Sequence, residues 1–288
     1  MKTIGLVLNK EKHKVAPVVE KIYHWLQGKN IRVLITDECA EILNINKNYY
    51  PLSQLAGMCD CLMVWGGDGT ILNCARAAAP AGTPIYGVNA GRLGFLTEVD
   101  IPDLLPGLEK LIAGNYTVEE RMMIEARVYR KDKLLKTLTG LNDAVISKGA
   151  FARLIWLELH VNGEHMNSYP ADGVIVASST GSTAYSLSAG GPIVGPDLDL
   201  MVVTPICPHT LSARPLVISP DYTISVMAET NRGEIVLTVD GQCRFDLESF
   251  DVVQVRQAPY NAKFIRTENH NFYEILRKKL EEWNSSHV

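Results

Sequence analysis

The stretch Cys61-Leu62-Met63-Val64-Trp65-Gly66-Gly67-Asp68-Gly69-Thr70 decides the fold, because an apolar run of strand length ends in a glycine-rich turn. Residues 71–78 have the composition of a helix, so a strand, a turn and a helix are predicted in succession. Glycines permit positive φ angles and a close approach of the backbone to a ligand. Because a helix begins with unpaired N–H groups, we expect those near Gly69 and Thr70 to hold phosphate oxygens.

The turn matches neither of the two common phosphate-binding loops. A Walker A loop needs a lysine after its second glycine, and none is present. The dinucleotide fingerprint fails as well, because Leu72 stands where its third glycine is required. Taken alone, the turn is equally compatible with a tight structural connection that carries a solvated Asp68.

A second polar stretch favours a ligand site. It begins at Tyr169-Pro170-Ala171-Asp172-Gly173, passes through a strand over 174–177 and continues as Ser178-Ser179-Thr180-Gly181-Ser182-Thr183-Ala184-Tyr185-Ser186-Leu187-Ser188-Ala189-Gly190-Gly191-Pro192. Short hydroxyl groups and one aromatic ring suit a ribose and a flat base better than a core. The alternative is an ordinary loop rich in serine and glycine.

Together the two stretches resemble the NAD kinase family. Glycine-rich Asp turns also occur in diacylglycerol and sphingosine kinases and in phosphofructokinases, so the second stretch makes the resemblance specific. Four further stretches fit the same family in its order: Asn89-Ala90-Gly91-Arg92-Leu93-Gly94-Phe95-Leu96-Thr97, Leu141-Asn142-Asp143, Pro208-His209-Thr210-Leu211-Ser212-Ala213-Arg214-Pro215 and Asp240-Gly241-Gln242.

The resemblance implies that ATP phosphorylates NAD at the 2′-hydroxyl of the adenosine ribose, giving NADP and ADP. Such a transfer needs an acceptor for the hydroxyl proton and neutralisation of the phosphate charge. Asp68 is predicted to be the proton acceptor. The turn contains no lysine or arginine, so a divalent cation, Mg²⁺, is expected to neutralise the charge. It would be bound mainly by phosphates and water, and no metal-ligating residue is predicted.

The resemblance also implies a set of residues that bind the substrate and the nucleotide. Two positions depart from the family pattern. Asp143 replaces the more usual glutamate and is one methylene shorter, and Pro170 stands where related bacterial enzymes can carry a basic residue. The predicted binding residues are Gly69, Phe95, Asn142, Asp143, Arg153, Asp172, Thr180, Thr183, Ala184, Tyr185, Ser186, Leu187, Ser188 and Gln242.

Two regions of different pattern define the expected fold. Strands over 3–8, 31–36, 61–65 and 83–89 are separated by helical patterns, which predicts an α/β domain with a parallel sheet. Ligands bind at the carboxyl ends of such strands, where Asp68 lies. From Met122 onward short strands recur, including 155–161 and 164–169 around Asn162-Gly163, which predicts a β-rich, sandwich-like domain.

The predicted domains are residues 1–120, which form the α/β domain, residues 121–260, which form the β-rich nucleotide-binding domain, and residues 261–288. The last segment contains an amphipathic helix over 272–283. The family resemblance implies that this helix packs back on the first domain.

Composition excludes several partners. The 288 residues carry a net charge of −4, which gives no basic face for nucleic acid. No apolar run reaches the length of a membrane span, so we expect a cytoplasmic protein without a membrane partner. The six cysteines show no Cys-x-x-Cys spacing and are expected to be reduced core residues. The resemblance implies a homo-oligomer, either a dimer or a tetramer.

Three function classes remain open at the level of sequence. The favoured one is the ATP-dependent phosphorylation of NAD. A lipid kinase would share the Gly-Gly-Asp-Gly turn but would leave Thr180–Ser188 unexplained. A non-catalytic dinucleotide sensor would bind NAD or NADP without transfer, and the intact Asp68 argues against it.

Overall fold

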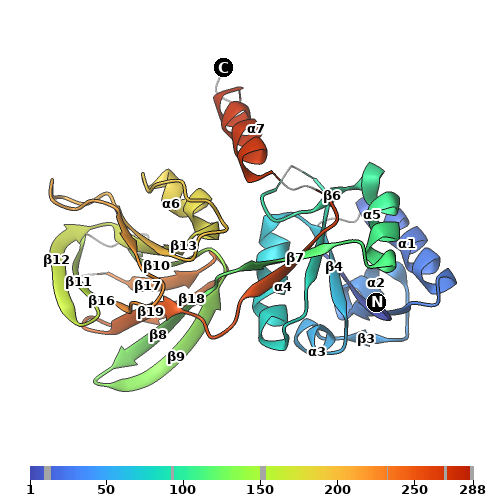
Figure 1. The fold of residues 1–288 in the computed structure, drawn as a ribbon. Coiled ribbons are helices and arrows are strands. Elements are labelled where there is room, and N and C mark those ends of the chain that lie inside the picture. The colour runs from blue at the N-terminus through green and yellow to red at the C-terminus, as the bar shows by residue number, and fades with distance from the viewer. Residues whose placement is uncertain (10–13, 92–93, 150–153, 232, 269–270, 286–288) are drawn as a thin grey trace. The chain divides into compact units, whose positions relative to one another are not determined.

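The computed structural model describes residues 1–9, 14–91, 94–149, 154–231, 233–268 and 271–285. The chain forms two compact units (Figure 1). Unit 1 consists of Met1–Glu120 and Ala262–Val288, and unit 2 consists of Arg121–Asn261. The chain therefore leaves unit 1 once and returns to it near its C-terminus.

Unit 1 is built on a sheet with the strand order β3-β2-β1-β4-β5-β20-β7, and β6 pairs with β5. Strand β4 lies at its centre, and all of its residues are buried. It pairs in parallel with β1 and β5, which confirms the predicted parallel α/β arrangement. The strands are β1 (Thr3–Leu8), β2 (Arg32–Thr36), β3 (Tyr49–Tyr50), β4 (Cys61–Gly66), β5 (Ile85–Asn89), β6 (Val99–Asp100), β7 (Thr117–Arg121) and β20 (Ala262–Arg266).

Helices pack on both faces of this sheet, because side chains of a strand alternate between the two faces. Helices α1 (Ala16–Gly28), α2 (Asp37–Leu43) and α5 (Leu104–Ala113) share one apolar core with residues of β1, β2, β4 and β5. Helices α3 (Leu52–Ala56) and α4 (Asp68–Ala78) approach the other face, where glycines make room for them. A Cβ on Gly5 would lie 3.2 Å from Leu55, and one on Gly87 would lie 2.8 Å from Ile71.

The returning strand β20 is fixed by a buried ion-pair network. Glu98, whose side chain is fully buried, accepts hydrogen bonds from Arg266 at 3.1 Å and from the backbone N–H of Thr267 at 2.6 Å. Arg266 also pairs with Glu119 at 2.6 Å. These contacts connect the loop before β6, the strand β7 and the end of β20. Part of unit 1 is therefore completed by residues from the end of the chain.

Helix α7 (Phe272–Ser285) follows β20 and confirms the predicted C-terminal helix (Figure 1). It contacts the rest of unit 1 at Phe95. The ring of Phe272 lies 5.8 Å from that of Phe95, and Lys279 Nζ lies 5.3 Å from the centre of the Phe95 ring.

Unit 2 consists of two antiparallel sheets, with the orders β15-β14-β13-β10-β17-β18 and β12-β11-β16-β19-β8-β9 (Figure 1). The predicted sandwich-like architecture is confirmed. The first sheet contains β10 (Asp143–Lys148), β13 (Gly173–Ser178), β14 (Met201–Ile206), β15 (Leu216–Ile218), β17 (Ile235–Val239) and β18 (Cys243–Leu247). The second contains β8 (Ile124–Arg130), β9 (Lys133–Gly140), β11 (Ile155–Val161), β12 (Glu164–Ala171), β16 (Ile224–Glu229) and β19 (Val252–Gln257).

One apolar core fills the space between the two sheets. Strand β11 contributes Ile155, Leu157 and Leu159, and β13 contributes Val174 and Val176. This alternation is typical of strands with one face on a core. The predicted hairpin between β11 and β12 turns at Asn162-Gly163, where both residues have a positive φ as a type I′ turn requires.

Two general expectations can be compared with the structure. Among the described residues, no helix combines the length and apolar character needed to cross a membrane.

The six cysteines are free thiols, and Cys39, Cys61 and Cys74 are buried as expected. Cys207, in contrast, is exposed, because it follows β14 in a loop. The expectation that all six are core residues was therefore wrong for Cys207, and Cys59 and Cys243 are only partly buried.

Candidate functional site

The glycine-rich turn joins the carboxyl end of β4 to the N-terminus of α4. Gly67 precedes the helix with φ −107° and ψ −170°. The turn glycines are not among the residues with a positive φ, so this turn does not use the positive φ angles that glycine permits. What the turn requires is space, because a Cβ on Gly66 would lie 2.4 Å from Thr70 Oγ1. Asn9, after β1, donates to the same hydroxyl at 3.1 Å.

In the first turn of α4, one of the two N–H groups that we expected to hold phosphate oxygens already has a partner. The N–H of Thr70 donates to the carbonyl of Gly67 at 3.0 Å, so it is engaged within the turn. Gly69 is exposed at the helix N-terminus. The positive end of the helix dipole lies at this terminus, where an anion is stabilised.

The carboxylate of Asp68 is half-buried and is held by two consecutive backbone amides. Phe95 N donates to Oδ2 at 3.0 Å, and Leu96 N donates to Oδ1 at 3.1 Å. An ionised carboxylate has about four lone-pair positions, so each oxygen retains acceptor capacity. The structure thus brings together two residues predicted separately, Asp68 and Phe95.

A second group of predicted residues lies at one end of a sheet in unit 2. Strand β10 begins at Asp143, which pairs with Ala177 of β13, and Ala144 pairs with Val239 of β17. Because both neighbours are antiparallel to β10, their carboxyl ends lie beside its start. Asn142 therefore lies close to the polar stretch after β13. The contact is tight, since a Cβ on Gly181 would lie 2.0 Å from the Asn142 carbonyl oxygen.

Asp240 organises this end of the sheet, although it was not among the predicted site residues. Its carboxylate accepts from the backbone N–H groups of Leu141, Asn142 and Asp143 at 3.1, 2.8 and 3.3 Å. It has a φ of 51° and begins the turn-favouring sequence Asp240-Gly241. That sequence was the available signal, but the prediction took only Gln242 from this stretch.

Asp143 is almost fully buried, with 4% of its surface exposed. Burial and, second, the negative charge of Asp240 raise the pKa of the Asp143 carboxyl to about 7. Near neutral pH this side chain therefore exists partly in its protonated form, which donates a hydrogen bond. A glutamate or aspartate with an ordinary pKa only accepts.

The polar stretch after β13 divides into buried and accessible side chains. The Thr180 hydroxyl accepts a hydrogen bond from the Arg121 guanidinium, and the Ser186 hydroxyl is hydrogen-bonded to that of Thr204. Both hydroxyls therefore have partners within unit 2. Tyr185 is 47% exposed. Of the remaining predicted residues in helix α6 (Tyr185–Ser188) and the turn before it, Thr183, Ala184 and Leu187 are half-buried and Ser188 is exposed.

Asp172 lies at the opposite end of β13 from Thr180, roughly 20 Å along the strand. There it pairs with Lys148 Nζ at 2.7 Å across the β10–β13 ladder. This lysine, not predicted from sequence, supplies a positive charge beside Asp172 although Pro170 does not. Gln242 is exposed in the turn after Asp240, and Arg153 lies outside the described residues.

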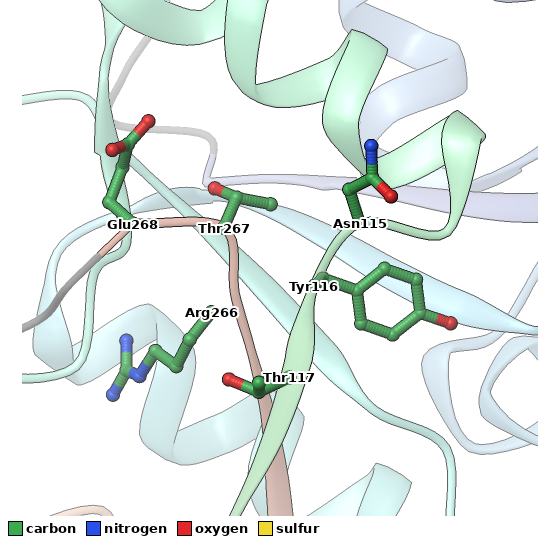
Figure 2. Close-up of a pocket in the computed structure, with 6 residues that line it drawn as sticks. All are labelled: Asn115, Tyr116, Thr117, Arg266, Thr267 and Glu268. Atoms are coloured by element: carbon green, nitrogen blue, oxygen red, sulfur yellow. The ribbon is translucent and has the colours of Figure 1, made fainter.

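A cavity of about 390 Å³ in unit 1 contains none of the predicted site residues. It is lined by Asn115, Tyr116, Thr117, Arg266, Thr267 and Glu268. Figure 2 shows that Tyr116 points away from Arg266 and Glu268, so the lining side chains do not converge on one point. Arg266 is also occupied by its two carboxylate partners. The candidate functional residues are therefore the Asp68 turn in unit 1 and, separately, the strand ends in unit 2.

The described residues contain no cluster of three or more His, Cys, Asp or Glu side chains that could hold a metal ion.

Both halves of the chain match a domain of one enzyme family. Residues 4–116 match the N-terminal domain of ATP-NAD kinases, and residues 141–267 match their C-terminal domain. An NAD kinase of Desulforamulus reducens is 50% identical over 99% of both chains. An NAD kinase of Moorella thermoacetica is 47% identical over 99% of this chain and 91% of its own length.

Two solved structures are similar over nearly the whole chain. The crystal structure of yeast NADH kinase complexed with NADH has a TM-score of 0.86 at 26% identity and covers 99% of this chain and 89% of its own. An NAD kinase from Archaeoglobus fulgidus in complex with ATP has a TM-score of 0.76 at 26% identity and covers 96% of this chain and 98% of its own.

Proposed function

The chain belongs to the NAD kinase family, which phosphorylates NAD with ATP, and from this we propose that it transfers the γ-phosphoryl group to the 2′-hydroxyl of the adenosine ribose. The products are NADP and ADP. Asp68 is the proton acceptor in this proposal, and the residues of unit 2 at the start of β10 and after β13 contribute to nucleotide binding.

The position of the Asp68 carboxylate carries the proposal. It stands at the carboxyl end of a central parallel strand and at the N-terminus of a helix, where ligands of such sheets bind. Two amides hold the carboxylate in one orientation, and each oxygen keeps a free lone pair. A fixed carboxylate with an open acceptor position is suited to take a proton from a hydroxyl.

In the proposed step the ribose 2′-oxygen attacks the γ-phosphorus of ATP. A new O–P bond forms while the bond between the γ-phosphorus and the bridging β–γ oxygen breaks, and ADP leaves. The proton of the 2′-hydroxyl passes to Asp68. The dipole of α4 stabilises negative charge at the same end of the helix.

The predicted binding residues of unit 2 have the chemistry for a nucleotide. Asn142 carries both a donor and an acceptor, and protonated Asp143 adds a donor. Tyr185 presents an accessible ring, on which a base can stack. These side chains, with Thr183 and Ser188, are our proposed contacts for ribose and base.

A divalent cation, Mg²⁺, is part of the proposal as the counter-charge of the transferred phosphoryl group. The described residues offer no ready set of protein ligands, so the proposal assigns the ion to phosphate oxygens and water. The chain's own contribution is to accept the hydroxyl proton at Asp68 and to bind the nucleotide.

The test is the formation of NADP from NAD, ATP and Mg²⁺ by the purified protein, measured with an NADP-specific dehydrogenase. An NAD analogue that lacks the adenosine 2′-hydroxyl should not be phosphorylated, whereas one that lacks the 3′-hydroxyl should be. Binding of NAD without turnover would indicate a sensor. Phosphorylation of the 2′-deoxy analogue would reject the proposed position of transfer.

The role of Asp68 is tested by Asp68→Asn. We expect a loss of kcat of about 10²- to 10⁴-fold, the usual contribution of a general base, with NAD affinity retained. The matched control is Asp103→Asn, which changes an exposed carboxylate of the same unit and should keep wild-type turnover. Near wild-type kcat in the Asp68 variant would exclude this residue as the proton acceptor.

We also propose that the protein is a homo-oligomer, a dimer or a tetramer. Unit 2 exposes several large apolar side chains, among them Trp156, Met166 and Val217, which are 48%, 50% and 58% exposed. Covering these side chains with a second copy of the chain would be favourable, because burial of apolar surface stabilises association. Light scattering should give two or four times the 31.8 kDa mass of one chain.

A further inference from the structure

The segment Gly94–Leu96 surrounds the carboxylate of Asp68 on the side of its two amide donors. Gly94 is buried, and the next two residues donate their N–H groups to Oδ2 and Oδ1 at 3.0 and 3.1 Å. The segment is 27 and 28 residues away from Asp68 in sequence. Its backbone therefore reaches the turn through the fold.

Only a glycine fits at position 94, because the space that a Cβ would occupy is filled by the Asp68 side chain. A Cβ at this position would lie 2.2 Å from Asp68 Oδ1 and 2.9 Å from Asp68 Cγ. The φ of Gly94 lies outside the left-handed region, so alanine is compatible with its backbone. The conflict created by a methyl group is thus with the carboxylate itself.

The segment has little freedom to move away from Asp68. Behind it, a Cβ on Gly87 of β5 would lie 3.1 Å from the carbonyl oxygen of Leu96, so the two backbones are already close. Glu98 N donates to the carbonyl of Gly87 at 2.8 Å. On its outer side, the Phe95 ring contacts Phe272 and Lys279 of α7. A methyl group on residue 94 would therefore displace the Asp68 side chain.

We propose that Gly94 is a positioning residue for phosphoryl transfer. Because it lacks a Cβ, it leaves the space in which the amides of Phe95 and Leu96 hold the Asp68 carboxylate. This inference rests on the proposed role of Asp68 as proton acceptor. Gly94 touches no reacting atom and acts only through Asp68.

The experiment compares wild type, Gly94→Ala, Asp68→Asn, the double variant Gly94→Ala with Asp68→Asn, and the control Gly28→Ala. A Cβ on Gly28, at the end of α1, would have no atom within 4 Å. A misplacement of about 1 Å can cost on the order of 10²-fold in rate. We therefore expect a kcat loss of that order for Gly94→Ala, with the KM values for NAD and ATP retained.

The double variant separates action through Asp68 from an independent effect. If Gly94 acts only through that carboxylate, the double variant should have the same kcat as Asp68→Asn alone. The proposal would be overturned if the loss of kcat in the double variant were the product of the losses in the two single variants. Wild-type kcat in Gly94→Ala would overturn it as well. If Asp68→Asn itself keeps full turnover, the proposed function of Asp68 fails, which is a distinguishable result.

A stability measurement tests the contact even if Gly94→Ala folds poorly. Asp68→Ala removes the carboxylate with which a Cβ on residue 94 would collide. The double variant Asp68→Ala with Gly94→Ala should therefore have the same Tm as the single variant Asp68→Ala. Gly94→Ala alone should have the lowest Tm of the set. If its Tm loss persists without the carboxylate, the conflict lies elsewhere and the proposal is wrong.

Discussion

Asp143 shows how one buried carboxyl group links stability to pH. Burial, followed by the charge of Asp240, raises its pKa to about 7. In the unfolded chain the same group titrates near pH 4. Between about pH 4 and 7 the folded state therefore holds a proton that the unfolded state has lost. As pH rises through this window the free energy of unfolding falls, and the loss is complete above pH 7.

The variant Asp143→Asn should remove this dependence, because the amide resembles the protonated acid but does not ionise. Calorimetry should show that the difference in Tm between Asp143→Asn and wild type is more positive at pH 8 than at pH 5, because only wild type loses stability as the pH rises. Asp246→Asn, which changes a mostly exposed carboxylate on β18, serves as the control. A Tm difference between Asp143→Asn and wild type that is constant with pH would contradict the assignment.

The ion pair of Lys148 and Asp172 shows why single residues were hard to predict. The sequence indicated a missing charge at Pro170, and the structure supplies one from β10. Likewise, the Asp68 turn could be predicted because it is contiguous, whereas the amides that hold its carboxylate come from a distant segment. Antiparallel register and loop packing decide such contacts, and neither is encoded in a local pattern.

At the level of elements, Glu98 is the main anchor for the returning strand β20. Glu98→Ala leaves the buried Arg266 with one carboxylate fewer and two backbone N–H groups without their acceptor. Loss of one partner of a buried ion pair costs about 3–5 kcal/mol, and we expect a decrease of that order in the free energy of unfolding.

Urea unfolding measures this effect, and Glu268→Ala is the matched control. Glu268 pairs with Lys110 at 2.6 Å, but the two side chains are 59% and 42% exposed. Its removal should change stability by about 0–1 kcal/mol, as for other surface pairs. Equal effects of the two variants would show that the Glu98 network does not anchor β20.

Helix α7 supports the segment that carries the Phe95 amide. In Phe272→Ala the Phe95 ring loses its aromatic neighbour, and we expect a several-fold lower kcat with unchanged KM for ATP. Lys278→Ala, which removes an exposed pair with Glu274 at 2.9 Å on the same helix, is the control. Steady-state kinetics would contradict this role for α7 if both variants had wild-type kcat.

The elements that the sequence predicted well share length and a clear apolar pattern. Strands β1, β4 and β11 have six or seven residues with continuous or alternating apolar side chains, which the period of a strand identifies. Helices α2 and α3, in contrast, have seven and five residues, too few to establish a helical period. Strand β9 was also missed, since most of its side chains are exposed.

At the scale of the whole molecule, the two units differ in continuity. Unit 2 is one uninterrupted segment with its own core between two sheets. Residues 1–120 of unit 1 lack β20, whose Phe264 and Ile265 are almost fully buried at 1% and 0% exposure. We therefore expect a fragment of residues 121–261 to fold alone, and a fragment of residues 1–120 to fail to fold.

Circular dichroism and urea titration of the two fragments would test this expectation. The fragment 121–261 should show a β-rich spectrum and a cooperative transition, as small single domains do. Adding a peptide of residues 262–288 to the fragment 1–120 should restore structure. A cooperative transition in residues 1–120 alone would mean that β20 is dispensable.

The late return of the chain into unit 1 has a consequence for biosynthesis. A ribosome adds residues from the N-terminus, so the sandwich is fully emerged while the sheet begun before it still lacks β20. Until β20 is made, the nascent α/β half lacks the strand that pairs with β5 at Ile85, although β6 already pairs with β5 at Val88 and Asn89. In this protein the part that is made first is completed last, because the sheet that carries the Asp68 turn gains β20 only after all of unit 2 has been made.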